Sequence, residues 1–194
     1  MSVEGPRDQA AQDERARLFV ALELPEDARR ALVRWRSEAL RDARGLRLIS
    51  TEHLHATLCF LGWRGVGDID EIWRACGALA TRRAAELRLG EAMWLPGRRP
   101  RVLAVELVDP GERLLEAQSA LSGALEAGGW YRPEKRPFFG HVTVARVARG
   151  ARPRPRDLPP PPPLDLRGSR VTLYRSRLAP SGARYEPLHT LELE

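Results

Sequence analysis

Two short segments that share one pattern constrain this chain more than any other feature of its sequence. Residues 55–58 read His-Ala-Thr-Leu within the apolar stretch 51–62, and residues 141–144 read His-Val-Thr-Val. Short apolar runs bounded by polar residues and glycine are typical of buried strands. Because alternate side chains of a strand point to opposite faces, each segment turns a histidine and a threonine to one face and two apolar residues to the other. We therefore expect the rest of the chain to bring these two strands face to face.

The repeated His-x-Thr pattern predicts chemistry rather than packing. The chain has only four histidines, and random placement would give about 0.12 matches, so two matches in the same strand context are unexpected for a motif of this length. An ordinary imidazole pKa of about 6.5 lets one histidine be neutral while the other is protonated. His55 and His141 therefore suit general acid–base catalysis, in which one takes a proton from water and the other gives a proton to a leaving oxygen.

The side chains near the two histidines indicate an anionic substrate. Thr57 and Thr143 lie two residues after the histidines, on the same face, and can donate hydrogen bonds to phosphate oxygens, whose charge rises in the transition state. Arg146 follows the second pattern and can add a cation. Strand alternation places Arg146 opposite His141, so it reaches the site only if the strand bends or twists; a solvated arginine at the strand end is the alternative.

Hydrophobic periodicity, proline and glycine predict strands and helices that alternate along the chain. Strands are predicted at residues 17–24, 46–50, 51–62, 87–95, 102–108, 141–147, 170–178 and 185–193, and helices at 25–41, 68–85 and 110–127. Their mixed order favours an α+β fold with antiparallel pairing over a doubly wound parallel sheet. We expect a mobile polar tail at 1–16, a proline-rich extended connector at 149–163, a turn at 181–182, and a single two-lobed domain at 17–194.

The composition of the chain indicates which binding partners and which cellular compartment to expect. The net charge of +6, carried by 31 arginines and the single lysine Lys135, permits a nucleic-acid partner without proving one. The sequence contains no apolar run long enough to span a bilayer and no secretory signal, so we expect a cytoplasmic protein without membrane contact. Cys59 and Cys76 lack Cys-x-x-Cys spacing, and we expect small, buried, reduced side chains.

Four blocks of the sequence resemble the 2H phosphoesterase superfamily, and within it the RNA 2′,3′-cyclic phosphodiesterases, also named 2′-5′ RNA ligases. The blocks are RLFVALELP at 17–25, HLHATLCFLG at 53–62, FFGHVTVAR at 138–146 and SGARYEPL at 181–188. The resemblance implies a bilobal α+β fold, with two antiparallel sheets flanked by helices around a central cleft. It also implies hydrolysis of RNA 2′,3′-cyclic phosphate ends to 2′-phosphomonoesters by a monomer, with no metal or other cofactor. The RNA partner would be tRNA fragments or small cyclic nucleotides.

The resemblance also assigns roles to the residues singled out above. His55 would be the proton donor to the leaving 3′ oxygen, and His141 the proton acceptor that activates water. Thr57 and Thr143 would hold the phosphate oxygens, and Arg146 matches a family arginine.

Two positions depart from the family pattern. Gly140 stands where the family commonly has proline before the second histidine, and Cys59 stands where it often has a charged or polar residue. By strand alternation Cys59 shares the face of His55, so we expect it at the edge of the cleft.

Several alternatives remain open from the sequence. His53 and His55 share a face and could hold a metal, but no third ligand is evident, and His189 is expected on the surface. Phe19 is expected in the core, with base stacking as the alternative. Aromatic and basic residues in 130–140 suit either single-stranded RNA binding or packing. The function itself has two alternatives: ligation, which is the reverse reaction, and a non-catalytic RNA-binding module.

Overall fold

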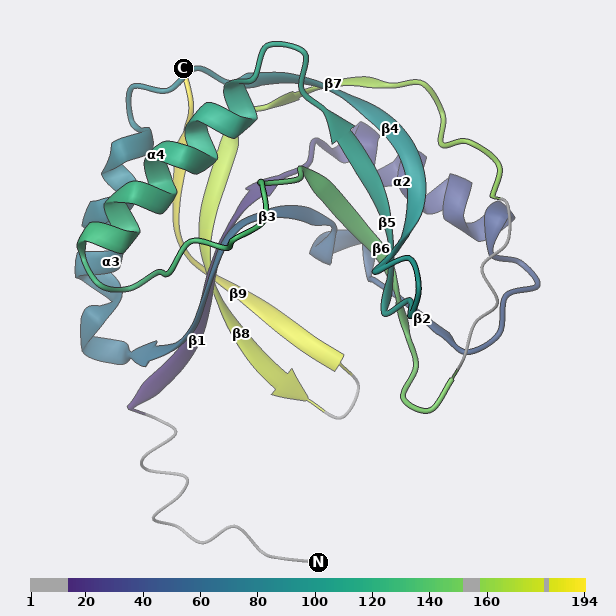
Figure 1. Cartoon of the computed structure of the whole chain (residues 1–194), viewed down its shortest axis with the longest axis horizontal. Helices are drawn as coiled ribbons and strands as arrows, with labels where there is room; N and C mark the ends of the chain where they lie inside the picture. The colour runs from purple at the N-terminus through teal and green to yellow at the C-terminus, as the bar shows by residue number, and fades with distance from the viewer. Residues whose placement is uncertain (1–13, 152–157, 180–181) are drawn as a thin grey trace, which may run out of the picture.

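The computed structural model describes residues 14–151, 158–179 and 182–194. Nine strands and three α-helices lie in this part of the chain (Figure 1). The strands are β1 (Arg15–Glu23), β2 (Leu46–Leu48), β3 (His55–Gly65), β4 (Ala85–Leu95), β5 (Val102–Val108), β6 (His141–Val147), β7 (Asp165–Gly168), β8 (Arg170–Ala179) and β9 (Gly182–Glu192). The helices are α2 (Glu26–Ala39), α3 (Ile69–Cys76) and α4 (Arg113–Ala127).

The strands form one curled antiparallel sheet made of two halves. The order is β7-β4-β5-β6-β3-β1-β8-β9, and β2 pairs with β6. In the described chain, β3 and β6 join the halves through a single residue pair, Ala56 with Val142. The α+β class is confirmed, and the two sheets expected from the resemblance are continuous through this pair.

Each half contains the same strand–helix–strand unit. In the first unit β1 is followed by α2, the short β2 and then β3, which pairs with β1. In the second, β5 is followed by α4 and then by β6, which pairs with β5. Each helix contacts the histidine strand of the other unit, α2 contacting β6 and α4 contacting β3. This exchange of helices ties the two lobes into one structure.

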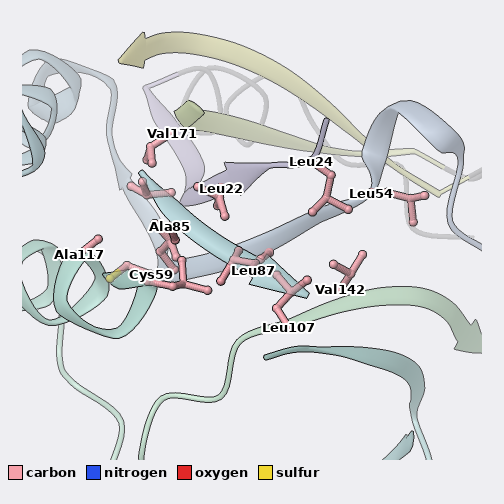
Figure 2. Packing of buried hydrophobic residues seen from close by; sticks show 14 of the residues in the cluster. Leu22, Leu24, Leu54, Cys59, Ala85, Leu87, Leu107, Ala117, Val142 and Val171 are labelled. Carbon is pink, nitrogen blue, oxygen red and sulfur yellow. The ribbon is translucent and has the colours of Figure 1, made fainter. Parts of the chain in front are cut away.

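Apolar side chains beneath the helices form one continuous core. Leu32 of α2 and Leu121 of α4 are fully buried, and each burial stabilises the fold by about 1.5–3 kcal/mol. Ala56 and Val142, the apolar members of the two His-x-Thr segments, are also fully buried. Figure 2 shows Val142 beside Leu107 and Leu87 in this core. Since the apolar faces of β3 and β6 point into the core, their histidine faces point into the opposite, concave side of the sheet.

The described structure differs from the sequence predictions mainly at element ends. The helix predicted at 68–85 ends at Cys76 and gives way to a 3-10 turn that starts at Gly77, because glycine is a poor helix former. The sequence prediction missed strand β7, which follows the predicted proline-rich connector. Strand β1 begins at Arg15, so the last two residues of the predicted tail belong to this strand. Residues 1–13, 152–157 and 180–181, which hold most of that tail, part of the connector and half of the predicted turn, lie outside the described residues.

The proline-rich connector is held against α2. The indole Nε1 of Trp35 in α2 donates to the carbonyl of Pro159 at 2.9 Å, which fixes the described end of the connector against that helix.

Within the described residues, no helix is long and apolar enough to cross a membrane.

Candidate active site

A one-residue bulge follows the threonine in each histidine strand. In the β1–β3 pairing, Val20 is opposite Cys59 and Ala21 is opposite Thr57, so Leu58 is left without a partner. In the β5–β6 pairing, the step from Ala145 to Thr143 leaves out Val144 in the same way. A bulge places two consecutive side chains on one side and reverses the alternation beyond it. The two bulges therefore occupy the same position in the two His-x-Thr segments.

These bulges decide where the residues after each threonine point. Leu58 and Cys59 are both buried, and the next side chain, Phe60, returns to the concave side. The prediction that Cys59 lies at the cleft edge is therefore wrong: it is 1% exposed and lies near Ala117 of α4 (Figure 2). In β6 the bulge supplies the bend that Arg146 needed, and its side chain lines the cleft.

Both bulges are contacted by a side chain from the exchanged helix. The guanidinium of Arg36 in α2 donates to the carbonyl of Val144 at 3.1 Å, and the amide of Gln118 in α4 donates to the carbonyl of Leu58 at 3.4 Å. Burial lowers the pKa of Arg36 from its ordinary value. A bulge frees backbone groups from the ladder. Gln118 supplies a donor to the Leu58 carbonyl, and the Val144 carbonyl accepts both from Arg36 and from the backbone N–H of Ile49 at 3.0 Å.

The two histidines are oriented by the same backbone contact. Nδ1 of His55 donates to the carbonyl of His53 at 2.7 Å, and Nδ1 of His141 donates to the carbonyl of Phe139 at 2.8 Å. Each ring therefore carries its fixed proton on Nδ1 and keeps Nε2 for chemistry. In His55, Nε2 lies 3.1 Å from the Thr57 hydroxyl, which donates to it when the ring is neutral.

The central cleft has a volume of about 900 Å³ and is cationic. His55, Thr57 and Arg146, three of the predicted site residues, line it. His141 and Thr143 lie beside it on β6: the Ala56–Val142 pair has His55 and Thr57 on its β3 side and His141 and Thr143 on its β6 side. Because the strands are antiparallel, the position of each histidine lies across from the position of the other strand's threonine. The structure thus brings all five predicted residues to one concave face. Three further arginines line the cleft, namely Arg17, Arg47 and Arg184.

Aromatic rings form the floor around His55. Phe19 lies 5.1 Å from the His55 ring and stacks on Tyr174 at 5.1 Å, and Tyr185 meets His55 edge-on at 5.4 Å. Phe19 is 3% exposed, so its predicted burial is confirmed, but it is buried among the rings of the cleft and not in the cluster of apolar side chains beneath the helices. The rings remove water from one side of the imidazole and hold its plane.

This environment disfavours the charged form of His55. Burial lowers its pKa from 6.5 to about 4, and the positive charges of Arg146, His53 and His141 act in the same direction. The hydrogen bond to the His53 carbonyl opposes the shift. His55 is therefore neutral in the empty protein near pH 7, and an anion in the cleft would favour its protonated form.

We expect inorganic phosphate to raise the pKa of His55. In the free protein the ring should titrate near pH 4, and an anion held by Thr57 and Arg146 should move that titration to higher pH because it stabilises the imidazolium. NMR titration of ¹³C-labelled histidine, with His55→Gln to assign its signal, measures both values. A titration of His55 that phosphate leaves unchanged would mean that no anion binds beside it.

Sequence reasoning missed several residues of the cleft. Arg17 and Tyr185 fall inside blocks that carried the family resemblance, and that placement was the available signal. Phe60 also falls inside such a block, although strand alternation alone would not turn it to the cleft, because it faces the cleft only through the bulge. Arg47 gave no signal, since it sits in a three-residue strand.

The structure also bears on the alternatives left open. The described residues contain no group of three or more His, Cys, Asp or Glu side chains placed to hold a metal ion. The His53 ring contacts Tyr185 at 4.6 Å, and His189 stacks on Trp73 at 5.1 Å. In the loop before β6, three aromatic residues pack against the core while Phe139 stacks on His141 at 5.6 Å. The three packed residues are Trp130, Tyr131 and Phe138.

The two positions that depart from the family pattern have physical explanations. A Cβ at Gly140 would lie 3.0 Å from Leu114 Cδ2, so α4 leaves little room for a side chain there. Cys59 and Cys76 are free and buried, and burial raises each thiol pKa to about 12, which confirms the prediction of reduced, apolar-like side chains.

Comparison with known proteins assigns the chain to a family. The LigT like Phosphoesterase model matches residues 22–104. Over 179 residues the chain is 30% identical to the RNA 2′,3′-cyclic phosphodiesterase of Escherichia coli K12, with 89% of this chain and 93% of the relative covered. The chain belongs to the LigT-like phosphoesterase family. A second LigT-like relative, the RNA 2′,3′-cyclic phosphodiesterase of Thermus thermophilus, is 33% identical over 187 residues, covering 91% of this chain and 90% of the relative.

Solved LigT-like structures have the same architecture. A crystal structure described as a phosphoesterase matches with a TM-score of 0.80 at 28% identity, covering 93% of this chain and 99% of that one. Escherichia coli LigT complexed with phosphate matches with a TM-score of 0.74 at 26% identity, covering 93% and 98%. The curled sheet and its flanking helices are thus common to LigT-like phosphoesterases.

Proposed function

We propose that this LigT-like phosphoesterase hydrolyses the 2′,3′-cyclic phosphate ends of RNA to 2′-phosphomonoesters, using two histidines and no metal. The observation that carries the proposal is the duplicated geometry: on two paired strands a histidine donates from Nδ1 to a backbone carbonyl and is followed two residues later by a threonine on the same face, beside a cationic cleft. The relatives named RNA 2′,3′-cyclic phosphodiesterase support the substrate class. The proposed substrates are RNA ends in the cytoplasm, from tRNA fragments down to small cyclic nucleotides. A monomer suffices, because one chain supplies both histidines.

The proposed reaction uses each histidine once. Nε2 of His141 accepts a proton from water as the water oxygen bonds to phosphorus. The bond from phosphorus to the 3′ oxygen breaks, and protonated Nε2 of His55 gives its proton to that oxygen. The product carries a 3′-hydroxyl and a 2′-phosphate. Thr57, Thr143 and Arg146 donate to the non-bridging oxygens, whose charge rises in the transition state.

The resting hydrogen bond between Thr57 and His55 fits this sequence of events. In the empty protein the Thr57 hydroxyl donates to neutral Nε2 of His55. A bound phosphodiester anion offers the hydroxyl a charged acceptor, and the same anion favours protonation of His55. Substrate binding therefore converts both side chains to the forms that the reaction needs.

An electrophoretic assay tests the proposed function. A 5′-labelled RNA with a 2′,3′-cyclic phosphate end is incubated with the protein and excess chelator, and then with alkaline phosphatase. Hydrolysis exposes a monoester that phosphatase removes, which changes mobility; the cyclic end is resistant. Absence of turnover with chelator, restored by a divalent metal, would overturn the metal-free mechanism.

The same assay separates the two alternatives. Added RNA with a 5′-hydroxyl would yield a longer product if the protein ligates, since the same acid and base can run the reaction in reverse. If the RNA binds but is not converted under any condition, the result supports the alternative of a non-catalytic RNA-binding module. We expect hydrolysis to dominate, because water is in large excess over RNA 5′-hydroxyl ends.

A further inference from the structure

Beyond the cleft, β1 and β3 continue side by side and carry aromatic and cationic side chains on the concave face. Phe19 is opposite Phe60, and Arg17 is opposite Trp63. Opposed residues in an antiparallel pair share a face, and Phe19, Arg17 and Phe60 line the cleft. Trp63 therefore belongs to the same face, one step further from His55.

The residue after Trp63 confirms this orientation. Arg64 donates from Nε and Nη2 to the carbonyl of Trp130, at 3.0 and 2.6 Å, at the C-terminal end of α4. Arg64 thus points to the helix-covered side, and its neighbour Trp63 points to the concave side. Arg15 at the start of β1 also reaches this end of β3, with its Nη2 3.5 Å from the Trp63 carbonyl.

These side chains are not explained by packing. Phe60 is 46% exposed and Trp63 is 45% exposed, whereas Leu58, Cys59 and Leu61 of the same strand are buried. The Arg17 guanidinium lies 4.7 Å from the centroid of the Phe60 ring, which is cation–π geometry. Exposed flat rings interleaved with arginines are what single-stranded nucleic acids bind, through base stacking and phosphate pairing.

We propose that Phe60 and Trp63, with Arg15 and Arg17, form a platform for the RNA nucleotides upstream of the cyclic end. Bases stack on the two rings, and the arginines bind backbone phosphates. Along β1, Ala21 is opposite Thr57, Phe19 is opposite Phe60 and Arg17 is opposite Trp63. At about 3.3 Å per strand residue, the platform therefore extends from about 7 to about 13 Å beyond Thr57, and Trp63 lies further than Phe60 from a mononucleotide bound at the histidines. The platform is continuous with the cleft and has the charge that RNA requires. The proposal deepens the proposed function, on which it rests, by making the protein prefer oligonucleotides.

Kinetics on two substrates test this preference. One is a tetranucleotide with a 2′,3′-cyclic phosphate end, and the other is a nucleoside 2′,3′-cyclic phosphate. For Trp63→Ala we expect KM for the tetranucleotide to rise about tenfold with kcat unchanged, and kinetics on the mononucleotide to stay within about twofold of wild type. Trp63→Phe should restore most of the affinity. Phe60→Ala should raise KM more for the tetranucleotide than for the mononucleotide.

A matched control and a binding measurement keep the test decisive. Leu115→Ala removes a similarly exposed apolar side chain (42%) from α4, away from the platform, and should change neither substrate's kinetics. Fluorescence anisotropy with a tetranucleotide ending in a 2′-phosphate measures the platform without turnover. Equal affinity of wild type and Trp63→Ala, or equal loss on both substrates, would overturn the platform. Failure of wild type to turn over either substrate, with weakened binding in Trp63→Ala, would instead overturn the proposed function.

Discussion

Alanine at His141 should lower kcat on a cyclic-phosphate RNA by a factor of about 10² to 10⁴, the usual contribution of a general acid or base. The same loss is expected for His55→Ala, because the Nδ1 hydrogen bond of each ring leaves Nε2 as the atom that can act in the proposed reaction. KM should change little. Stopped assays with purified variants measure both constants, and thermal melting checks that the fold is retained.

His189→Ala is the matched control for the two catalytic variants. Its ring stacks on Trp73, outside the cleft, so activity should stay at the wild-type level. The double variant His55→Ala/His141→Ala should be little worse than either single variant, since the two groups act in one step. Single variants that each retain more than a tenth of wild-type kcat would argue against an acid–base pair.

Removal of the Arg146 side chain should lower kcat/KM by about 10²-fold, in the range for one donor lost from a developing charge. Arg146→Lys should recover part of the activity, because it restores the charge without the planar fork. The variant has a second readout: Arg146 contributes to the low pKa of His55, so Arg146→Ala should raise that pKa in the empty protein.

Arg149→Ala controls for general loss of positive charge. Arg149 is exposed just beyond the end of β6 and does not line the cleft. Wild-type kinetics are expected for it at ordinary ionic strength. An Arg146→Ala variant with unchanged kcat/KM and an unchanged His55 titration would place this guanidinium in solvent, as strand alternation alone predicted.

Local patterns predicted most elements of this fold. The bounds of β5 and β6 were predicted to the residue, because proline, glycine and polar residues bracket them. The α+β class followed from the mixed order of elements. The exchange of α2 and α4 between the two units depends on contacts between residues far apart in the chain, which no local pattern records. Strand β7 was missed for a related reason: its four residues form a strand only because β4 lies beside them.

Within the site, the period-2 rule succeeded up to each threonine and failed after it. His55, Thr57, His141 and Thr143 reach the concave face as alternation requires. One residue later each strand bulges, so Cys59 turns into the core and Arg146 turns into the cleft. The bulges follow from pairing with β1 and β5 and from the contacts of Arg36 and Gln118. Sequence alternation alone could not place them.

Phosphorus NMR of the product shows whether the two histidines open a 2′,3′-cyclic phosphate toward the 2′-phosphate. A short RNA with a cyclic end is followed with excess chelator, for wild type, His55→Ala and His141→Ala. We predict conversion to a 2′-monophosphate by wild type, lost in both variants. A 3′-monophosphate would reverse the leaving group, and turnover that persists in either variant would contradict the two-histidine mechanism.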